Sequence, residues 1–245
     1  MTIFSFPPGL ILLIFLLTFV AGMAAGYLVC LFSNAFLNEK NHSSLAGLPS
    51  GCRITELFMG VFFVFSLIRF DGDLTGFFMT AGLAVILLEL SLVDFAICEI
   101  PDFLIISGIV WWVIFRIIYT FRAGPGSGEK AAAFLIRFIK SSYKNLLSAL
   151  FFSFSILILS LIMDHILKRE SFGGGDIKLI FMTDLYLGFA EGLYALIIAC
   201  ILGLLAFFIT RKSKIPFGPC LSLSAFLSIL TGKYIIHCYQ LLFLL

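Results

Sequence analysis

Hydrophobic residues occur in long runs along the chain, and short polar segments separate these runs. The runs cover residues 9–32, 54–68, 74–98, 103–121, 145–166, 179–210 and 220–231. A helix needs about 20 apolar residues to cross the hydrocarbon core of a membrane. The run at 179–210 is long enough for two crossings if it breaks near Glu191 and Gly192. The pattern therefore predicts an all-α, polytopic membrane protein with seven to eight transmembrane helices.

Two shorter features refine this prediction. Gly22 and Gly26 place two small residues on one face of the first helix, where a neighbouring helix can pack closely, although such spacing is also common in apolar helices without that role. Residues 131–140 alternate small or apolar residues with Arg137 and Lys140. This pattern predicts a basic amphipathic helix that lies in the membrane interface, separate from the crossing at 145–166.

The composition excludes most other classes of protein. Of the 245 residues, 61% are hydrophobic and 12% are charged, and the mean hydropathy is +1.14. A soluble domain has about 45–50% apolar and about 25% charged residues. The net charge of +2 gives no reason to expect a nucleic-acid partner, so membrane lipid is the expected surrounding. The six cysteines show no CxxC spacing, and we expect neither a metal site nor a cofactor.

Basic residues in short loops set the orientation of a membrane protein. If the first loop and the segments at 168–178 and 211–214 face the cytoplasm, eight basic residues lie on that side and seven on the other. The imbalance supports this orientation only weakly.

Ionisable residues inside apolar runs are costly and therefore point to function. Among the acidic residues inside these runs or next to their ends, the candidates are Glu56, Glu89, Asp94, Asp102, Asp176, Asp184 and Glu191. Asp176 follows three glycines and begins a helix, which fits a ligand site or a simple helix cap. Asp94 lies near the end of the run at 74–98, where it could also pair with Arg69 or Lys178.

Two facing carboxyl groups can share one proton and cleave a peptide bond with water. Such aspartyl proteolysis needs no metal, serine or cysteine. The chain has no GxSxG and no HExxH motif, so serine and zinc peptidases are not indicated.

Four segments follow one another along the chain: Arg53 with Glu56 before an apolar run, residues 94–104 with the pattern D-x6-PDxL, residues 172–179 with GxGDxKL, and residues 215–219 with PFGP. Together and in this order they resemble the type IV prepilin peptidase family, in which Arg and Glu lie at the entry to the second span. The resemblance implies a GxGD aspartic protease that removes the basic leader of prepilin or pseudopilin precursors at the cytoplasmic face of the inner membrane. It implies a catalytic pair, Asp94 and Asp176, with supporting or substrate-binding roles for Asp102, Lys178, Gly173, Gly175, Glu56, Pro216 and Gly218.

The chain also departs from that family. Its first loop has about twenty residues and one cysteine, Cys52, whereas many members carry a domain with two CxxC pairs that supports N-methylation. We therefore expect residues 1–53 to form an N-terminal transmembrane helix with a short cytoplasmic loop, and residues 54–245 to form the peptidase membrane domain. Methylation is not expected.

Two other functions use the same carboxyl groups. An intramembrane GxGD protease would cut inside the apolar helix of its substrate. An ion- or proton-coupled transporter would use Glu89, Asp94 and Asp176, and its sequence would contain a repeat with two interrupted helices, which we do not find. For the prepilin peptidase, the sign of the charge makes Glu99, Asp102 and Glu170 the candidates to meet a basic leader.

Overall fold

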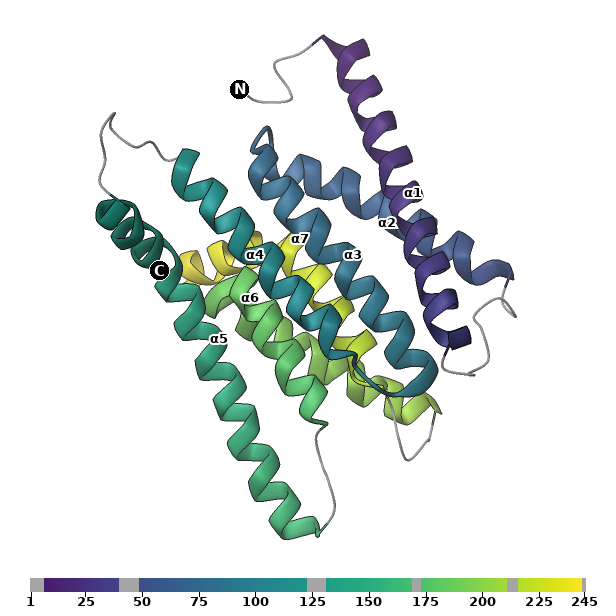
Figure 1. Ribbon diagram of the computed structural model, residues 1–245, viewed down its shortest axis with the longest axis vertical. Coiled ribbons are helices and arrows are strands. Elements are labelled where there is room, and N and C mark those ends of the chain that lie inside the picture. The colour runs from purple at the N-terminus through teal and green to yellow at the C-terminus, as the bar shows by residue number, and fades with distance from the viewer. Residues whose placement is uncertain (1–6, 40–48, 123–130, 169–172, 211–215, 244–245) are drawn as a thin grey trace.

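A computed structural model describes residues 7–39, 49–122, 131–168, 173–210 and 216–243 (Figure 1). These residues form seven helices, and none of them forms a β-strand. The helices are α1 (Pro8–Glu39), α2 (Pro49–Phe70), α3 (Leu74–Ile97), α4 (Asp102–Arg122), α5 (Ala131–Leu167), α6 (Gly174–Thr210) and α7 (Gly218–Phe243). The predicted all-α class is confirmed.

Within the described ranges, five helices are long and apolar enough to cross a membrane, namely α1, α3, α4, residues 134–166 of α5, and α6. The apolar part of α7 is shorter and covers Gly218–Gly232. The helix α2 carries Arg53, Glu56 and Arg69, which make it less apolar than the others. The protein is therefore a multi-pass membrane protein, and the seven to eight crossings stay a prediction.

The helix α6 reverses its direction within its length. Gly188 has a φ of 73° and interrupts the helical backbone three residues before the predicted break. The side-chain amide of Asn145 in α5 donates a hydrogen bond of 2.8 Å to the carbonyl of Leu185, which satisfies one acceptor at the interruption. Farther along, Gly203 faces the ring of Phe217, which directly precedes α7. The two ends of α6 therefore lie at the same end of the helix bundle.

That end also holds the C-terminus of α3 and the N-termini of α4 and α7, and we call it the site end (Figure 1). The rings of Phe36 in α1 and Phe103 in α4 are 5.7 Å apart, so the C-terminal part of α1 reaches the site end as well. At the opposite end, Arg69 of α2 binds Glu191 at 3.4 Å and the carbonyl of Ile229 at 3.0 Å.

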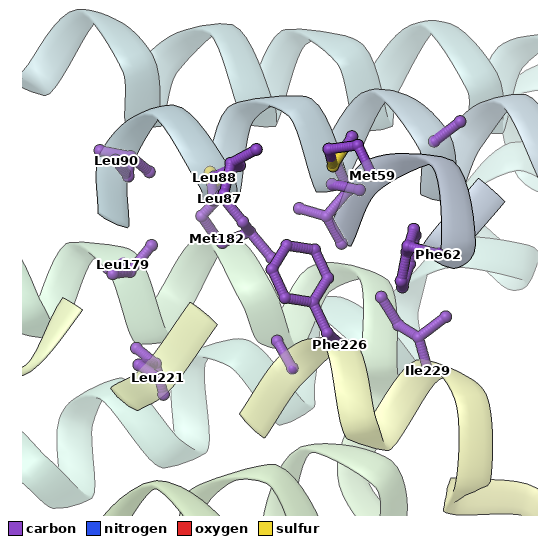
Figure 2. Packing of buried hydrophobic residues seen from close by; sticks show 14 of the residues in the cluster. Met59, Phe62, Leu87, Leu88, Leu90, Leu179, Met182, Leu221, Phe226 and Ile229 are labelled. Atoms are coloured by element: carbon purple, nitrogen blue, oxygen red, sulfur yellow. The ribbon is translucent and has the colours of Figure 1, made fainter. Parts of the chain in front are cut away.

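The core lies where α3 packs against α2, α6 and α7 (Figure 2). Phe226 of α7 makes edge-to-face contacts with Phe58 and Phe62 of α2, at centroid distances of 5.1 and 4.9 Å. The Ser222 hydroxyl of α7 donates to the carbonyl of Leu87 in α3 at 3.1 Å. Dense packing and a few hydrogen bonds between helices are what hold helices together in lipid.

Backbone contact joins α1 and α2. A Cβ atom on Gly22 would lie 2.6 Å from the carbonyl oxygen of Met59, and one on Gly26 would lie 2.7 Å from that of Thr55. The predicted close contact at these glycines is confirmed. Because Val29 of α1 belongs to the main core cluster, α1 packs as part of the bundle, and the division into domains at residue 53 stays a prediction.

Residues 131–140 are helical as predicted, but they do not form a separate helix, because α5 continues without a break from Ala131 to Leu167. Their position in the membrane interface stays a prediction. No glycine or proline occurs between Lys140 and Asn145 to end a helix there. Arg116 of α4 instead holds this part of α5 by donating to the carbonyl of Ser141 and to the hydroxyl of Ser142.

Candidate active site

Asp94 occupies the last turn of α3 and is almost completely buried, with 4% of its surface exposed. The helix ends directly after Ile97, where Cys98 adopts a left-handed conformation with φ of 52° and donates its N–H to the carbonyl of Asp94 at 2.8 Å. Pro101 then precedes the first residue of α4 and cannot continue α3. The local sequence therefore fixes Asp94 at the site end of a buried helix.

The N-terminus of α7 holds the Asp94 side chain. The backbone N–H of Gly218 donates a hydrogen bond of 2.8 Å to Oδ2 of Asp94. A Cβ atom on Gly218 would lie 2.6 Å from the same oxygen, so only glycine allows this approach. Phe217 packs towards Gly203. Pro216 precedes Phe217 and does not line the cavity that contains Asp94.

Asp176 lies in the first turn of α6, where three consecutive glycines precede it. Its backbone N–H donates to the carbonyl of Gly173 at 3.1 Å. A Cβ atom on Gly175 would lie 3.0 Å from that of Ile100, whereas one on Gly174 would meet nothing within 4 Å. The glycines thus bring the start of α6 against the connection between α3 and α4.

Asp94 and Asp176 line one cavity of about 300 Å³ at the site end. The other polar side chains that line the cavity belong to Cys98, Glu99, Asp102 and Lys178. Four carboxyl groups thus face one ammonium group, and the cavity is acidic.

Asp102 and Lys178 form an ion pair at the edge of this cavity. The Nζ atom of Lys178 lies 2.7 Å from Oδ1 of Asp102, and both side chains are more than half exposed. The pair joins the N-terminus of α4 to the first turns of α6. Asp94 does not pair with Arg69 or Lys178, so that alternative is wrong. Arg69 binds Glu191, and Lys178 binds Asp102.

The remaining ionisable candidates lie elsewhere. Glu56 of α2 packs its backbone against Gly26 and does not line the cavity. Glu89 of α3 and Asp184 of α6 are buried, but they also lie outside it. Glu170, together with Phe172 and Ile215 of the two motifs, lies outside the described residues.

Sequence reasoning assigned no role to Cys98 and Ile100, although both line the cavity. The available signal was their place between Asp94 and Pro101, in a connection too short to leave the neighbourhood of Asp94. Sequence reasoning also gave no physical reason for a role of Gly218, because its contact with Asp94 depends on how α7 approaches α3.

This arrangement suits general acid–base chemistry on a peptide bond. Two carboxyl groups in one cavity can divide the tasks of taking a proton from water and donating one to a carbonyl oxygen. No histidine lines the cavity beside the Cys98 thiol, so the described residues do not form a cysteine–histidine pair there. Nor do three or more His, Cys, Asp or Glu side chains in the described ranges converge as a metal site would require.

Comparison with known protein families gives a match over the segment that carries the cavity. The model of the type IV leader peptidase family matches residues 81–208, slightly more than half of the chain. The matched segment contains Asp94, Asp102, Asp176 and Lys178. No curated protein and no solved structure matches the chain.

Proposed function

We propose that the chain, which belongs to the type IV leader peptidase family, is an aspartic endopeptidase that removes the basic leader from prepilin or pseudopilin precursors. The cleavage takes place at the cytoplasmic face of the inner membrane. The observation that carries the proposal is the convergence of Asp94 and Asp176, 82 positions apart in the sequence, on one acidic cavity.

The two carboxyl groups act on a water molecule and on the scissile peptide bond. The ionised carboxylate takes a proton from the water as its oxygen attacks the carbonyl carbon, and the protonated carboxyl group donates to the carbonyl oxygen. When the C–N bond of the tetrahedral intermediate breaks, the carboxyl group that took the proton from water donates it to the leaving nitrogen. The other carboxylate takes back a proton from a hydroxyl group of the intermediate, which becomes a carbonyl again, so the pair returns to its starting state. The products are a leader that ends in a carboxylate and a mature chain with a new amino terminus.

The surrounding residues support this chemistry by position and charge. The Gly218 N–H fixes the orientation of the Asp94 carboxyl group, and the burial of Asp94 limits its motion. Beyond the paired Asp102 and Lys178, Glu99 adds negative charge at the cavity, which attracts a basic leader. The proposal does not include N-methylation, because residues 33–53 contain a single cysteine, Cys52.

A cleavage assay tests the proposal. The purified protein, in lipid nanodiscs, is given a synthetic precursor with a leader rich in lysine and arginine, a glycine and an apolar segment, and mass spectrometry identifies the products. We expect wild-type protein to cut at the junction. We expect Asp94→Asn and Asp176→Asn each to lower the rate by about 10²–10⁴-fold, the range for loss of an acid–base group.

The matched control is Asp184→Asn, which makes the same change at a buried carboxyl group of α6 outside the cavity. We expect it to retain the wild-type rate. If either Asp94→Asn or Asp176→Asn cleaved as fast as wild type, the proposed mechanism would be wrong. Cleavage inside the apolar segment would instead indicate the intramembrane protease.

The transporter alternative receives no support from the backbone. Helices interrupted in two matching places would mark such a protein. Within the described helices, a residue with non-helical backbone angles occurs inside a helix at Gly188 only.

A further inference from the structure

A second cavity adjoins the candidate active site and shares two residues with it. It has a volume of about 380 Å³, within the range of about 300–1,000 Å³ that is typical of ligand sites. Asp102 and Lys178 form part of both cavity walls. The other residues that line it are Ile105, Ile106, Ile109, Ser153, Ile177 and Phe181. We call it the apolar cavity.

Three helices build the apolar cavity. On α4, Ile105, Ile106 and Ile109 follow Asp102 at spacings that place them on one face of the helix. On α6, Phe181 lies one turn after Ile177. Ser153 contributes from α5. The packing of these helices, rather than a loop, therefore sets the shape of the cavity.

A tight contact fixes the separation of α4 and α6 beside this cavity. A Cβ atom on Gly108 would lie 2.1 Å from Sδ of Met182, and the Tyr186 hydroxyl donates to the Gly108 carbonyl. Gly108 lies between Ile106 and Ile109, so the two helices are held together at the level of the cavity itself. The cavity is thus a fixed feature of the bundle.

The two cavities differ in chemistry and share the Asp102–Lys178 pair as a common wall. Apart from the border pair and Ser153, the apolar cavity has isoleucine and phenylalanine walls, whereas the neighbouring one is acidic. On α6, Asp176 faces the acidic cavity and the next residue, Ile177, lines the apolar one. A peptide whose scissile bond lies at Asp176 therefore has an apolar surface directly beside that bond.

We propose that the apolar cavity is the subsite for hydrophobic side chains of the substrate on one flank of the scissile bond. The inference rests on the proposed function, because it takes Asp94 and Asp176 as the place of cleavage. It makes the enzyme select a peptide with a basic segment and an apolar segment next to each other. The acidic cavity receives the basic part, and the apolar cavity receives the adjoining hydrophobic side chains.

Filling the apolar cavity tests the inference. Ile106→Trp and Ile109→Trp place a larger side chain at its wall, and Ile114→Trp makes the same change on α4 at an exposed position outside it, where 44% of the residue surface is exposed against 59% for Ile106. For the precursor described above, we expect the first two variants to lower kcat/KM at least tenfold, since even one methylene in an apolar pocket changes it by about 10–200-fold. Ile114→Trp is expected to match wild type.

A second precursor, whose apolar residues next to the cut are replaced by serine, separates this role from a general loss of structure. Wild type is expected to cleave it at least tenfold more slowly than the first precursor, and Ile106→Trp is expected to add little further loss. An equal loss on both precursors would contradict the proposal. So would wild-type cleavage of the first precursor by both tryptophan variants.

Photo-crosslinking identifies the occupant directly. A benzophenone amino acid replaces Ile106 or, as a control, Ile114, in the Asp94→Asn variant, which binds the precursor without cutting it. We expect the precursor to be cross-linked from position 106 and not from 114. Cross-linking of lipid alone from position 106 would make the cavity a lipid site and overturn the inference, yet leave the peptidase assignment intact. Wild-type cleavage by Asp94→Asn would instead overturn the proposed function.

Discussion

At the residue scale, the site depends on a glycine that lets the backbone approach a carboxyl group closely. The carboxyl group of Asp94 has room for the Gly218 N–H because Gly218 has no Cβ atom. The sequence motif could indicate that Asp94, Asp176 and Gly218 matter. It could not indicate that Gly218 touches Asp94, because that contact joins helices separated by more than a hundred residues.

Gly218→Ala tests this contact. The added methyl group would lie 2.6 Å from Oδ2 of Asp94 and must displace it. A displacement of about 1 Å in an active site can lower the rate by about 10²-fold. We therefore expect kcat/KM of precursor cleavage to fall by about 10- to 100-fold, with thermal stability close to that of wild type.

Gly174→Ala is the control, since its added methyl group meets nothing within 4 Å although it lies two residues from Asp176. It should retain cleavage close to wild type. Equal activity of Gly218→Ala and Gly174→Ala would show that the contact with Asp94 is not needed for catalysis.

At the element scale, apolar runs predicted most helices. Errors arose where a contact with a neighbouring helix determines whether a helix breaks or continues. The run at 179–210 contains Gly188, Glu191 and Gly192, and the polar residue favoured a break at 191. The break lies at Gly188, where Asn145 of α5 satisfies the freed Leu185 carbonyl. Likewise, α5 is continuous where Arg116 of α4 binds it. Neither contact can be inferred from the pattern of a single run.

The contact between α1 and α2 gives a prediction about stability. Gly26→Leu would force a side chain into the backbone of Thr55 and Glu56, which lie 2.7–2.8 Å from the position of its Cβ atom. Overpacking of this kind costs typically about 1–3 kcal/mol. We expect a lower midpoint of thermal unfolding in detergent.

Gly9→Leu, also on α1, meets nothing within 4 Å and serves as the control. It should unfold at the same temperature as wild type. If Gly26→Leu were as stable as Gly9→Leu, α1 and α2 would not be in the close contact described above.

At the scale of the whole molecule, the main feature is that distant segments meet at one end of the bundle. The reversal of α6 at Gly188 returns the chain to the site end, so that α7 can begin beside Asp94 (Figure 1). The count of basic residues gave only a weak indication of which loops share a side. The structure places Asp94, Asp102 and Asp176 together because helix lengths and reversals leave their helix ends at the same level.

The central claim is that Asp94 and Asp176 catalyse the cleavage together. A double-mutant cycle measures this directly. Rates of precursor cleavage are compared among wild type, Asp94→Asn, Asp176→Asn and the double variant, with long incubations to detect residual activity. Groups that act together are strongly non-additive, so we predict that the double variant retains the same residual rate as either single variant. Losses that multiply in the double variant, or a single variant with the wild-type rate, would contradict a shared two-carboxyl mechanism.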